Sequence, residues 1–235
     1  MINMPYHIKV DRVPERVLLT GDPLRADRFG KLFDAKLVSS SREFRVYVGL
    51  VDSVPFAIVS HGIGGPSAAI VVEELISVGA RYLVRVGTAG ALEESARAGD
   101  IIIATALSSV HRGGGLGLYF GDLCPPSSPD PVLTTRLIET AKLRGLKVSE
   151  GPVFSSDSFY AEANLTGLLR GLRFKAIEME CATITALANL RGAKAACMLV
   201  VSNSAGSTNT DEDVVQRSLD AAADVALRTL ARFSS

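Results

Sequence analysis

The chain has 235 residues, with 25 Lys and Arg against 25 Asp and Glu, so its formal net charge is zero. A protein without excess positive charge lacks the broad electrostatic surface that nucleic acids and anionic membranes attract, so we expect neither as a partner. The length favours one domain over residues 1–235 rather than two. The hydrophobic content of 47% is enough to fill a large core.

The cysteines and the first residues bear on the compartment. Cys124, Cys181 and Cys197 lack the close spacing of a zinc site and are odd in number, so they predict neither a metal site nor a disulfide framework, and they fit a reducing cytoplasm. The first residues, MINMPYHIKVDRVPER, carry charges and no apolar run. No later apolar run reaches the roughly 18 residues that span a bilayer. The sequence therefore predicts a cytoplasmic protein.

Short apolar runs rich in β-branched residues recur along the chain and predict buried strands. They are RVLLTG, FRVYVGL, PFAIVSHG, RYLVRVG, DIIIATAL, GPVFSS, KAIEME and AACMLVVSN, near residues 18, 47, 58, 84, 103, 153, 177 and 199. Segments with helical spacing lie between several of them and begin at Pro23, Pro66, Asp130 and Cys181. This alternation predicts an α/β fold with a largely parallel sheet.

The last segment predicts an amphipathic helix from about Asp213 that covers the sheet. Spacings of three and four place its apolar residues on one face: Val215, Leu219, Ala222, Ala226, Leu230 and Phe233. The stretch before this helix, from Ser204, is small and polar, which is typical of an exposed loop. That loop directly follows a strand, and the sequence leaves open whether it closes over a ligand.

Ligands of parallel α/β sheets bind beyond the carboxyl ends of the strands, so the residues that follow each apolar run are candidates for a site. The first run ends in GDPLR at residues 21–25, where a glycine turn leads into a helix that begins at Pro23. Free N–H groups at a helix start, with a guanidinium one turn later, form an anion site. A capped helix with a surface arginine is the alternative.

A second glycine-rich turn, HGIGGPS at residues 61–67, opens another helix. It is not the dinucleotide-binding fingerprint, because Ser67 replaces the third glycine and no acidic residue follows at the expected distance. We expect His61 to be a satisfied histidine that contacts the backbone rather than a catalyst.

Three charged residues occur where a core would exclude them. Arg85 lies inside an apolar strand, and because an unpaired buried guanidinium is costly, it must meet either a bound anion or a structural carboxylate. Glu178 and Glu180 lie where a strand passes into an apolar helix. One of them is expected to bind hydroxyl groups. The alternative is a helix N-terminus stabilised by negative charge, which explains one glutamate better than two.

Together these motifs resemble the nucleoside phosphorylase family of the purine and uridine phosphorylase type. The resemblance runs through nearly the whole chain. Its marks are His7, GDPLR at 21–25, Arg42 in SREF, HGIGGPS at 61–67, RVGTAGA at 85–91, FSSDSFYAE at 154–162, EMECAT at 178–183 and VVSN at 200–203. It implies a single-domain α/β nucleoside phosphorylase fold with a central mixed, largely parallel sheet flanked by helices. It also implies a homo-oligomer, usually a hexamer built as a trimer of dimers, in which a neighbouring subunit completes each active site.

The resemblance further implies the site residues. Inorganic phosphate, a co-substrate rather than a cofactor, would be bound by Gly21, Arg25, Arg85 and Thr88, with Arg42 from the neighbour. The ribose would be bound by Met179, Glu178 and Glu180, with His7 from the neighbour. The base would be bound by Gly90, Phe159, Ser202 and Asn203. The groups implied to act in the chemical step are Arg85, Glu180 and Asn203, and no metal is implied.

Asn203 departs from a common pattern of the family, because members that accept adenosine widely carry Asp there as an acid at the purine N7. An asparagine donates a hydrogen bond but gives up no proton, which suits a 6-oxopurine nucleoside such as inosine or guanosine. Uridine phosphorylases also lack that Asp, but they carry Gln and Arg shortly after the Phe-Tyr pair, where this chain has AEANL at residues 161–165. The resemblance therefore favours purine nucleosides.

Several alternatives stay open at this stage. A uridine phosphorylase and a 5′-methylthioadenosine phosphorylase share the fold. A nucleosidase uses water in place of phosphate and has little need of three arginines, and a nonenzymatic nucleoside-binding protein has no need of both the phosphate and the ribose ligands.

Overall fold

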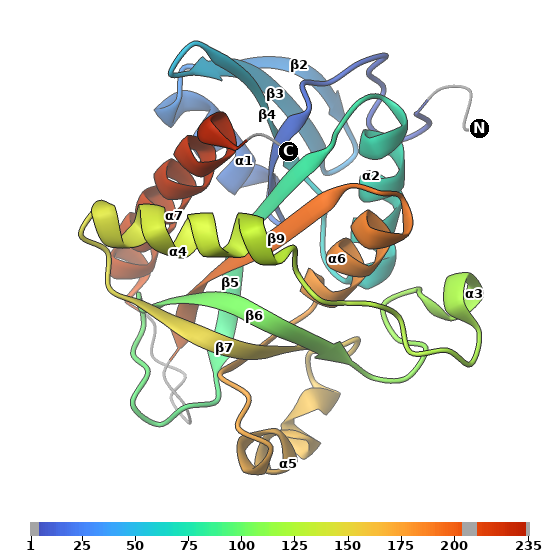
Figure 1. The fold of residues 1–235 in the computed structure, drawn as a ribbon, viewed down its shortest axis with the longest axis vertical. Helices are drawn as coiled ribbons and strands as arrows, with labels where there is room; N and C mark the ends of the chain where they lie inside the picture. The colour runs from blue at the N-terminus through green and yellow to red at the C-terminus, as the bar shows by residue number, and fades with distance from the viewer. Residues whose placement is uncertain (1–4, 204–210, 234–235) are drawn as a thin grey trace.

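The computed structural model describes residues 5–203 and 211–233, which form one nine-stranded sheet with helices on both faces (Figure 1). In order across the sheet the strands are β2 (Lys36–Ser41), β3 (Phe44–Val51), β4 (Val54–Ser60), β1 (Arg16–Thr20), β5 (Tyr82–Ala91), β8 (Ala176–Glu178), β7 (Val148–Ser155), β6 (Ile101–Ser109) and β9 (Lys194–Asn203). Strand β9 also pairs with β5. The strands β5, β8, β7, β6 and β9 therefore close into a ring.

The sheet is mixed, as the resemblance implied. The pairings β1–β4, β1–β5, β5–β9, β6–β7 and β7–β8 are parallel. The pairings β2–β3, β3–β4, β5–β8 and β6–β9 are antiparallel. Because β4, β1, β5 and β9 run in one direction, their carboxyl ends meet at one edge of the sheet, and ligands of such sheets bind at that edge.

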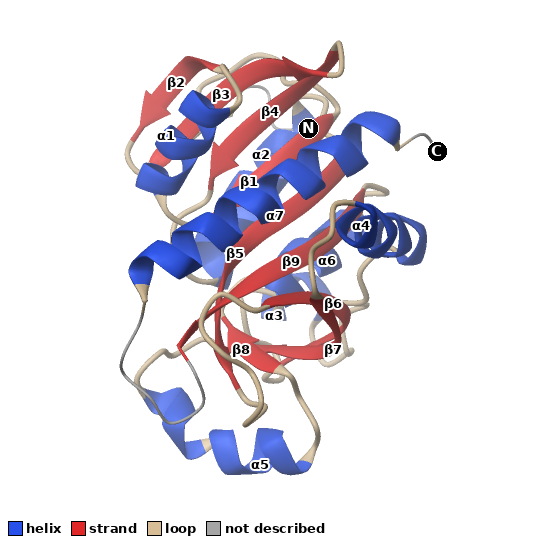
Figure 2. Ribbon diagram, turned by 90° about the vertical axis from the view of Figure 1, so that its left-hand side faces the viewer, coloured by secondary structure: helices blue, strands red, loops and turns tan. Residues whose placement is uncertain are grey.

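Two groups of helices cover the sheet. One hydrophobic core joins the strands to α1 (Pro23–Leu32), α4 (Pro131–Leu143) and α7 (Glu212–Arg232). A second core joins them to α2 (Gly65–Ser77) and α6 (Cys181–Leu190). Figure 2 shows α1 and α7 in front of the strands and α2 behind them. The short helices α3 (Gly117–Phe120), η1 (Ala161–Asn164) and α5 (Thr166–Gly171) complete the described elements, and Figure 1 shows α3 and α5 at the periphery.

The predicted strands and long helices are confirmed. Helix α7 begins within one residue of the predicted start, and its six predicted apolar residues are all buried. The polar loop predicted from Ser204 lies, as far as residue 210, outside the described residues. The apolar pattern did not predict β2, whose residues KLVSSS are mostly exposed, or α5, of which only Leu169 is buried. Both elements bury too little apolar surface to leave a periodic pattern.

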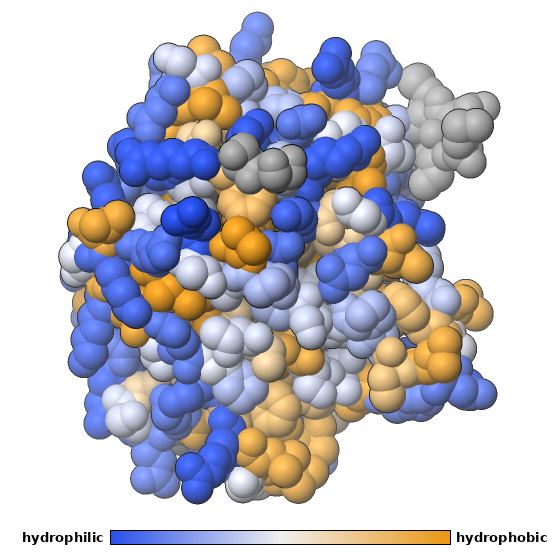
Figure 3. Space-filling model, in the orientation of Figure 1, coloured by the Kyte–Doolittle hydropathy of each residue, from blue (hydrophilic) through white to orange (hydrophobic). Residues whose placement is uncertain are grey.

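Some large hydrophobic side chains remain on the surface. Leu118 in α3 and Leu168 in α5 are exposed, as is Leu172 directly after α5. Figure 3 shows hydrophobic side chains gathered at the bottom of the view, where α5 lies, and at the right, where α3 lies.

Within the part of the chain that the structure describes, no helix is long and apolar enough to span a membrane.

Candidate active site

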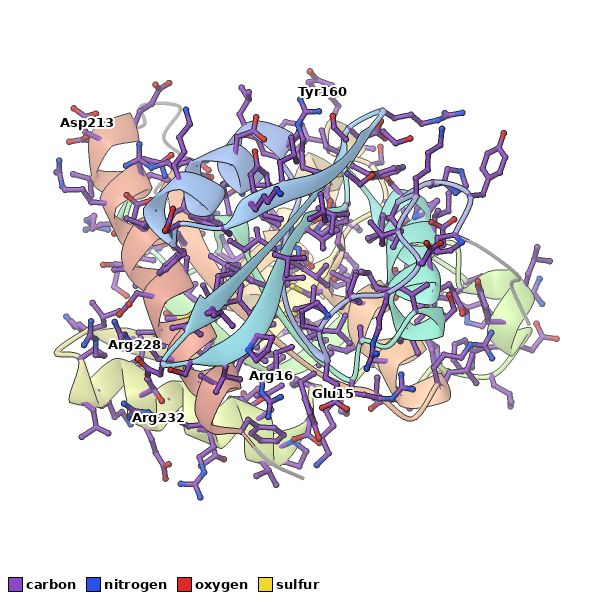
Figure 4. All side chains as sticks on the ribbon, turned by 90° about the horizontal axis from the view of Figure 1, so that it is seen from above. Glu15, Arg16, Tyr160, Asp213, Arg228 and Arg232 are labelled. Carbon is purple, nitrogen blue, oxygen red and sulfur yellow. The ribbon has the colours of Figure 1, made fainter. Side chains whose placement is uncertain are left out.

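A cavity of about 840 Å³ lies at the carboxyl ends of β1, β5, β8 and β9. Among the residues that line it are eleven of the predicted site residues: Gly21, Arg25, Arg85, Thr88, Gly90, Phe159, Glu178, Met179, Glu180, Ser202 and Asn203. Figure 4 places Tyr160, the neighbour of Phe159 in the chain, on the side of the molecule opposite Arg16, the first residue of β1. The cavity therefore occupies the edge of the sheet at which a ligand was expected.

A buried ion pair forms the floor of the cavity. Arg85 is only 4% exposed, although it lies within β5. Its Nη2 contacts Oε2 of Glu180, and its Nη1 lies 3.5 Å from Oε2 of Glu178. Gly87 leaves room for the guanidinium, because a Cβ there would lie 2.2 Å from Nη1. Burial is the largest influence and opposes the positive charge, but the negative groups around the guanidinium, first among them Glu180, together outweigh it and raise the pKa of Arg85 above its ordinary value.

The two glutamates have different partners. Glu178 ends β8 and accepts hydrogen bonds from the backbone N–H of Glu180 at 2.9 Å and of Cys181 at 3.0 Å, so it stabilises the start of α6. Glu180 pairs with Arg85 and also accepts from the N–H of Gly64 at 2.6 Å. Burial is the largest influence and opposes ionisation of Glu180, but Arg85, His61 and the N–H of Gly64 together outweigh it and hold the pKa of Glu180 below its ordinary value. Glu180 is therefore a charged carboxylate that faces the cavity.

Arg25 adds a second guanidinium to the same end of the cavity. It lies in the first turn of α1, whose N-cap is Asp22. Its Nη1 donates to Oγ1 of Thr20 at 3.4 Å, and within residues 5–203 and 211–233 it forms no ion pair. Burial, and next the charge of Arg85, lower the pKa of Arg25. Two neighbouring guanidiniums at a helix start favour the predicted anion site over a surface arginine.

His61 lies beneath this end of the cavity and is fully buried. Its backbone N–H donates to the carbonyl of Thr20 at 2.9 Å, and its carbonyl accepts from Oγ of Ser67 at 2.6 Å. Neither ring nitrogen makes a hydrogen bond of good geometry among the described residues, although the backbone of Gly62 lies close enough to favour the protonated ring. Burial, followed by the charge of Arg85, lowers the pKa of His61 to about 4, so the ring is neutral at pH 7.

The other end of the cavity carries the predicted base-binding residues. Phe159 is 64% exposed, and its ring meets that of Tyr160 edge-on with centroids 5.4 Å apart. Asn203, the last residue of β9, is paired with Gly90 of β5. Oγ of Ser202 donates to Oδ1 of Asn203 at 2.9 Å. An asparagine amide can donate a hydrogen bond through its NH2 group, but it releases no proton.

Two predicted site residues do not line the cavity of their own chain. Nδ1 of His7 lies 2.8 Å from Oε1 of Glu74, and the His7 ring meets that of Phe44 at 6.0 Å between centroids. Arg42, in the turn between β2 and β3, borders a separate depression together with Tyr6. Both therefore lie beside the same hairpin, and neither lines the cavity, although Glu43, the neighbour of Arg42 in the chain, does. The expectation that a neighbouring subunit supplies them stays a prediction.

Four polar residues line the cavity that the sequence analysis gave no role: Asp22, Glu43, Ser67 and Glu162. Glu43 follows Arg42 in the hairpin turn, and its Oε1 lies 3.4 Å from the position of a Cβ at Gly62. Glu162 lies two residues after Tyr160. An acidic residue close to two aromatic residues was the only sequence signal that could have identified it as lining the cavity. The described residues contain no group of three or more His, Cys, Asp or Glu that could hold a metal ion.

The sequence profile of the phosphorylase superfamily matches residues 15–233 of this chain. The chain belongs to this superfamily. It is 37% identical over 215 residues to a uridine phosphorylase of Thermococcus kodakarensis, with 84% of this chain and 76% of the relative covered. It is 35% identical over 216 residues to a guanosine phosphorylase of Halorubrum lacusprofundi, with 88% of each covered.

A solved structure agrees with this assignment. The crystal structure of uridine phosphorylase from Vibrio fischeri ES114 superposes with a TM-score of 0.90 at 29% identity and covers 99% of both chains. The resemblance to the nucleoside phosphorylases and the α/β fold that it implied are therefore confirmed, and the chain is an enzyme of the pentosyltransferase class.

The buried histidine gives the first testable prediction. The folded chain binds a proton at His61 only near pH 4, whereas the unfolded chain binds it near the ordinary pKa of 6.5. Between these values the unfolded state holds more protons, so stability falls as the pH falls, by about 3 kcal/mol in all for this group. The free energy of unfolding, measured in urea from pH 7 to pH 4, should therefore fall less steeply for His61→Asn than for the unmodified protein.

His111→Asn, which removes an exposed histidine, is the matched control and should keep the slope of the unmodified protein. Equal slopes for His61→Asn and the unmodified protein would contradict a neutral His61 in the folded state.

Proposed function

We propose that this enzyme catalyses the phosphorolysis of purine nucleosides and prefers 6-oxopurine nucleosides such as inosine and guanosine. The reaction breaks the N-glycosidic bond, releases the free base and transfers the ribose to phosphate as ribose 1-phosphate. Phosphate is a co-substrate, and no cofactor takes part. The observation that carries the proposal is the charge pattern of the cavity. Arg25 forms no ion pair with the described residues, and it lies close to Arg85, whose charge lowers the pKa of Arg25 after burial has done so.

Phosphate would bind at the end of the cavity lined by Gly21, Arg25, Arg85 and Thr88. The start of α1 offers backbone N–H groups, and the two guanidiniums neutralise the dianion. Arg85 already holds a carboxylate, that of Glu180. When phosphate takes the place of that carboxylate, Glu180 becomes available to accept hydrogen bonds from the ribose hydroxyls.

The glycosidic bond breaks as positive charge develops at C1′ of the ribose. Glu180 stays close to Arg85 and Arg25, whose positive charges favour its ionised form, so it would place a negative charge beside the sugar and stabilise that cation. Met179 offers an apolar surface for the ring to pack against. Glu178 acts indirectly, because it accepts hydrogen bonds from the N–H groups at the start of α6 and so positions Glu180. Phosphate held at the arginines would be positioned to attack C1′.

Phe159 would stack on the departing base, with Gly90, Ser202 and Asn203 at its edge. A 6-oxopurine can take up leaving-group charge on its carbonyl oxygen, so a neutral donor at N7 suffices. Adenine lacks that carbonyl and benefits from an acid, which an asparagine cannot be. The amide of Asn203 therefore favours inosine and guanosine over adenosine.

Phosphorolysis of uridine is the second candidate, because the relatives from Thermococcus and Vibrio are named uridine phosphorylases. The purine proposal is supported against it by the residues after Tyr160, where AEANL replaces the Gln and Arg that the resemblance leads us to expect in a uridine site. Phosphorolysis of 5′-methylthioadenosine and simple hydrolysis are less favoured. A hydrolase needs no second guanidinium beside Arg85.

We also propose that the enzyme works as a homo-oligomer, a hexamer built as a trimer of dimers, in purine salvage in the cytoplasm. The position of His7 and Arg42 supports the assembly, since neither lines the cavity of its own chain and both lie beside one hairpin. A neighbouring copy that packs against this hairpin would receive both side chains at its own phosphate and ribose sites.

A mixing experiment tests the shared site. Arg85→Ala and Arg42→Ala subunits are each expected to be inactive alone. After verified subunit exchange, a site that takes Arg85 from one chain and Arg42 from the other is intact, and random pairing restores up to about a quarter of the sites. No recovered activity after exchange would mean that each site is built from one chain.

A substrate panel tests the reaction and the base preference together. Base release from inosine, guanosine, adenosine and uridine is measured with and without phosphate, in the unmodified enzyme and in Asn203→Asp. We expect phosphate-dependent release of the 6-oxopurines with ribose 1-phosphate as product. A carboxyl group whose pKa is raised by burial can protonate N7, so Asn203→Asp should raise the ratio of adenosine to inosine turnover about tenfold.

Equal rates without phosphate, with free ribose as product, would favour the nucleosidase. Faster turnover of uridine than of every purine nucleoside would overturn the purine proposal, and an unchanged ratio in Asn203→Asp would remove Asn203 from specificity.

A further inference from the structure

Glu162 brings a carboxylate to the base end of the cavity. It lies in η1 and lines the cavity together with Phe159, Ile177 and Asn203. None of the roles assigned above uses it. Glu180 already pairs with Arg85, so Glu162 is an additional acid in the lining of the cavity.

The surroundings of Glu162 hold its side chain in place without neutralising it. The side chain of Ser156 hydrogen-bonds to the carboxylate, and the backbone N–H of Glu162 donates to the carbonyl of Ser158 at 3.0 Å. In the part of the chain that the structure describes, no Lys, Arg or His forms an ion pair with Glu162. Burial, and after it the charge of Glu178, raise the pKa of Glu162. A carboxylate so placed is stabilised by any N–H donor that a ligand offers.

The polar edges of the nucleobases differ in what they offer. An ionised carboxylate only accepts hydrogen bonds, and its two oxygens match two adjacent N–H donors. Guanine presents such a pair, N1–H and the 2-amino group, and hypoxanthine presents N1–H alone. Adenine presents a lone pair at N1, and uracil presents N3–H between two carbonyl oxygens that a carboxylate repels. The edge that fits a carboxylate best is therefore that of guanine.

We propose that Glu162 is a specificity-determining residue that accepts hydrogen bonds from N1–H and the 2-amino group of a bound guanine, so that guanosine is the preferred nucleoside. This proposal rests on the proposed purine phosphorolysis and narrows it within the 6-oxopurines. Asn203 and Glu162 then serve the two polar edges of one purine. Asn203 offers its NH2 group to N7, and Glu162 accepts from the opposite edge while Phe159 covers the ring.

The test compares kcat/KM for guanosine, inosine, adenosine and uridine at saturating phosphate in the unmodified enzyme, in Glu162→Gln and in Glu162→Ala. Glu94→Gln, which changes an exposed glutamate that does not line the cavity, is the matched control. We expect the unmodified enzyme to cleave guanosine faster than inosine. In Glu162→Gln and Glu162→Ala, kcat/KM for guanosine should fall at least tenfold, mainly through KM, with a smaller fall for inosine and none for adenosine.

Each outcome bears on one claim. If the unmodified enzyme cleaves purine nucleosides but prefers inosine to guanosine, the role of Glu162 is overturned and the proposed function stands, and no variant is needed for that result. The same holds if the ratio of guanosine to adenosine turnover is equal in the unmodified enzyme and both variants. An equal fall for all four nucleosides would indicate a structural role and would also overturn the proposal. If no purine nucleoside is cleaved, the proposed function itself fails.

Discussion

The candidate active site depends on one buried guanidinium. Arg85 lies buried in β5 between the parallel strands β1 and β9, where a charge without a partner would cost several kcal/mol. Glu180 and Glu178 offset that cost, and because they come from the junction of β8 and α6, the ion pairs tie that junction to β5. Gly87 is required beside it, since any side chain there would collide with the guanidinium. The charge, the two carboxylates and the glycine therefore form one unit.

This arrangement would let one site bind both a phosphate and the ribose of a nucleoside, as the proposed function requires. Without substrate, Glu180 satisfies Arg85 and the N–H of Gly64, so neither buried charge lacks a counterion. Burial, and next the charge of Arg85, lower the pKa of Arg25, and a phosphate dianion between the two guanidiniums would offset the repulsion between them. In the proposed reaction, phosphate would therefore relieve this repulsion and in the same step release Glu180 for the sugar. Neutral His61 beneath them adds no further positive charge.

Much of this could be predicted from the sequence, and the exceptions have physical causes. Apolar periodicity predicted the strands and long helices, because each of them buries a large face, but not β2 or α5, which bury little. Because charged residues are unusual inside apolar runs, Arg85, Glu178 and Glu180 could be identified as candidate site residues. Periodicity in the sequence does not show which groups a side chain contacts, so the different partners of Glu178 and Glu180 could be found only from the structure. Glu162 lies in a short irregular segment, where no pattern distinguishes a residue that faces the cavity from one that faces solvent.

The exchange of Glu180 for phosphate at Arg85 is the central claim, and phosphate binding to the enzyme without nucleoside tests it most directly. Isothermal titration calorimetry compares the unmodified enzyme with Glu180→Gln, in which a neutral amide replaces the competing carboxylate. The account predicts that Glu180→Gln binds phosphate about tenfold more tightly, since one charged hydrogen bond no longer has to be broken, while nucleoside turnover falls because the cationic transition state loses its counterion. Weaker or unchanged phosphate binding in Glu180→Gln would contradict it.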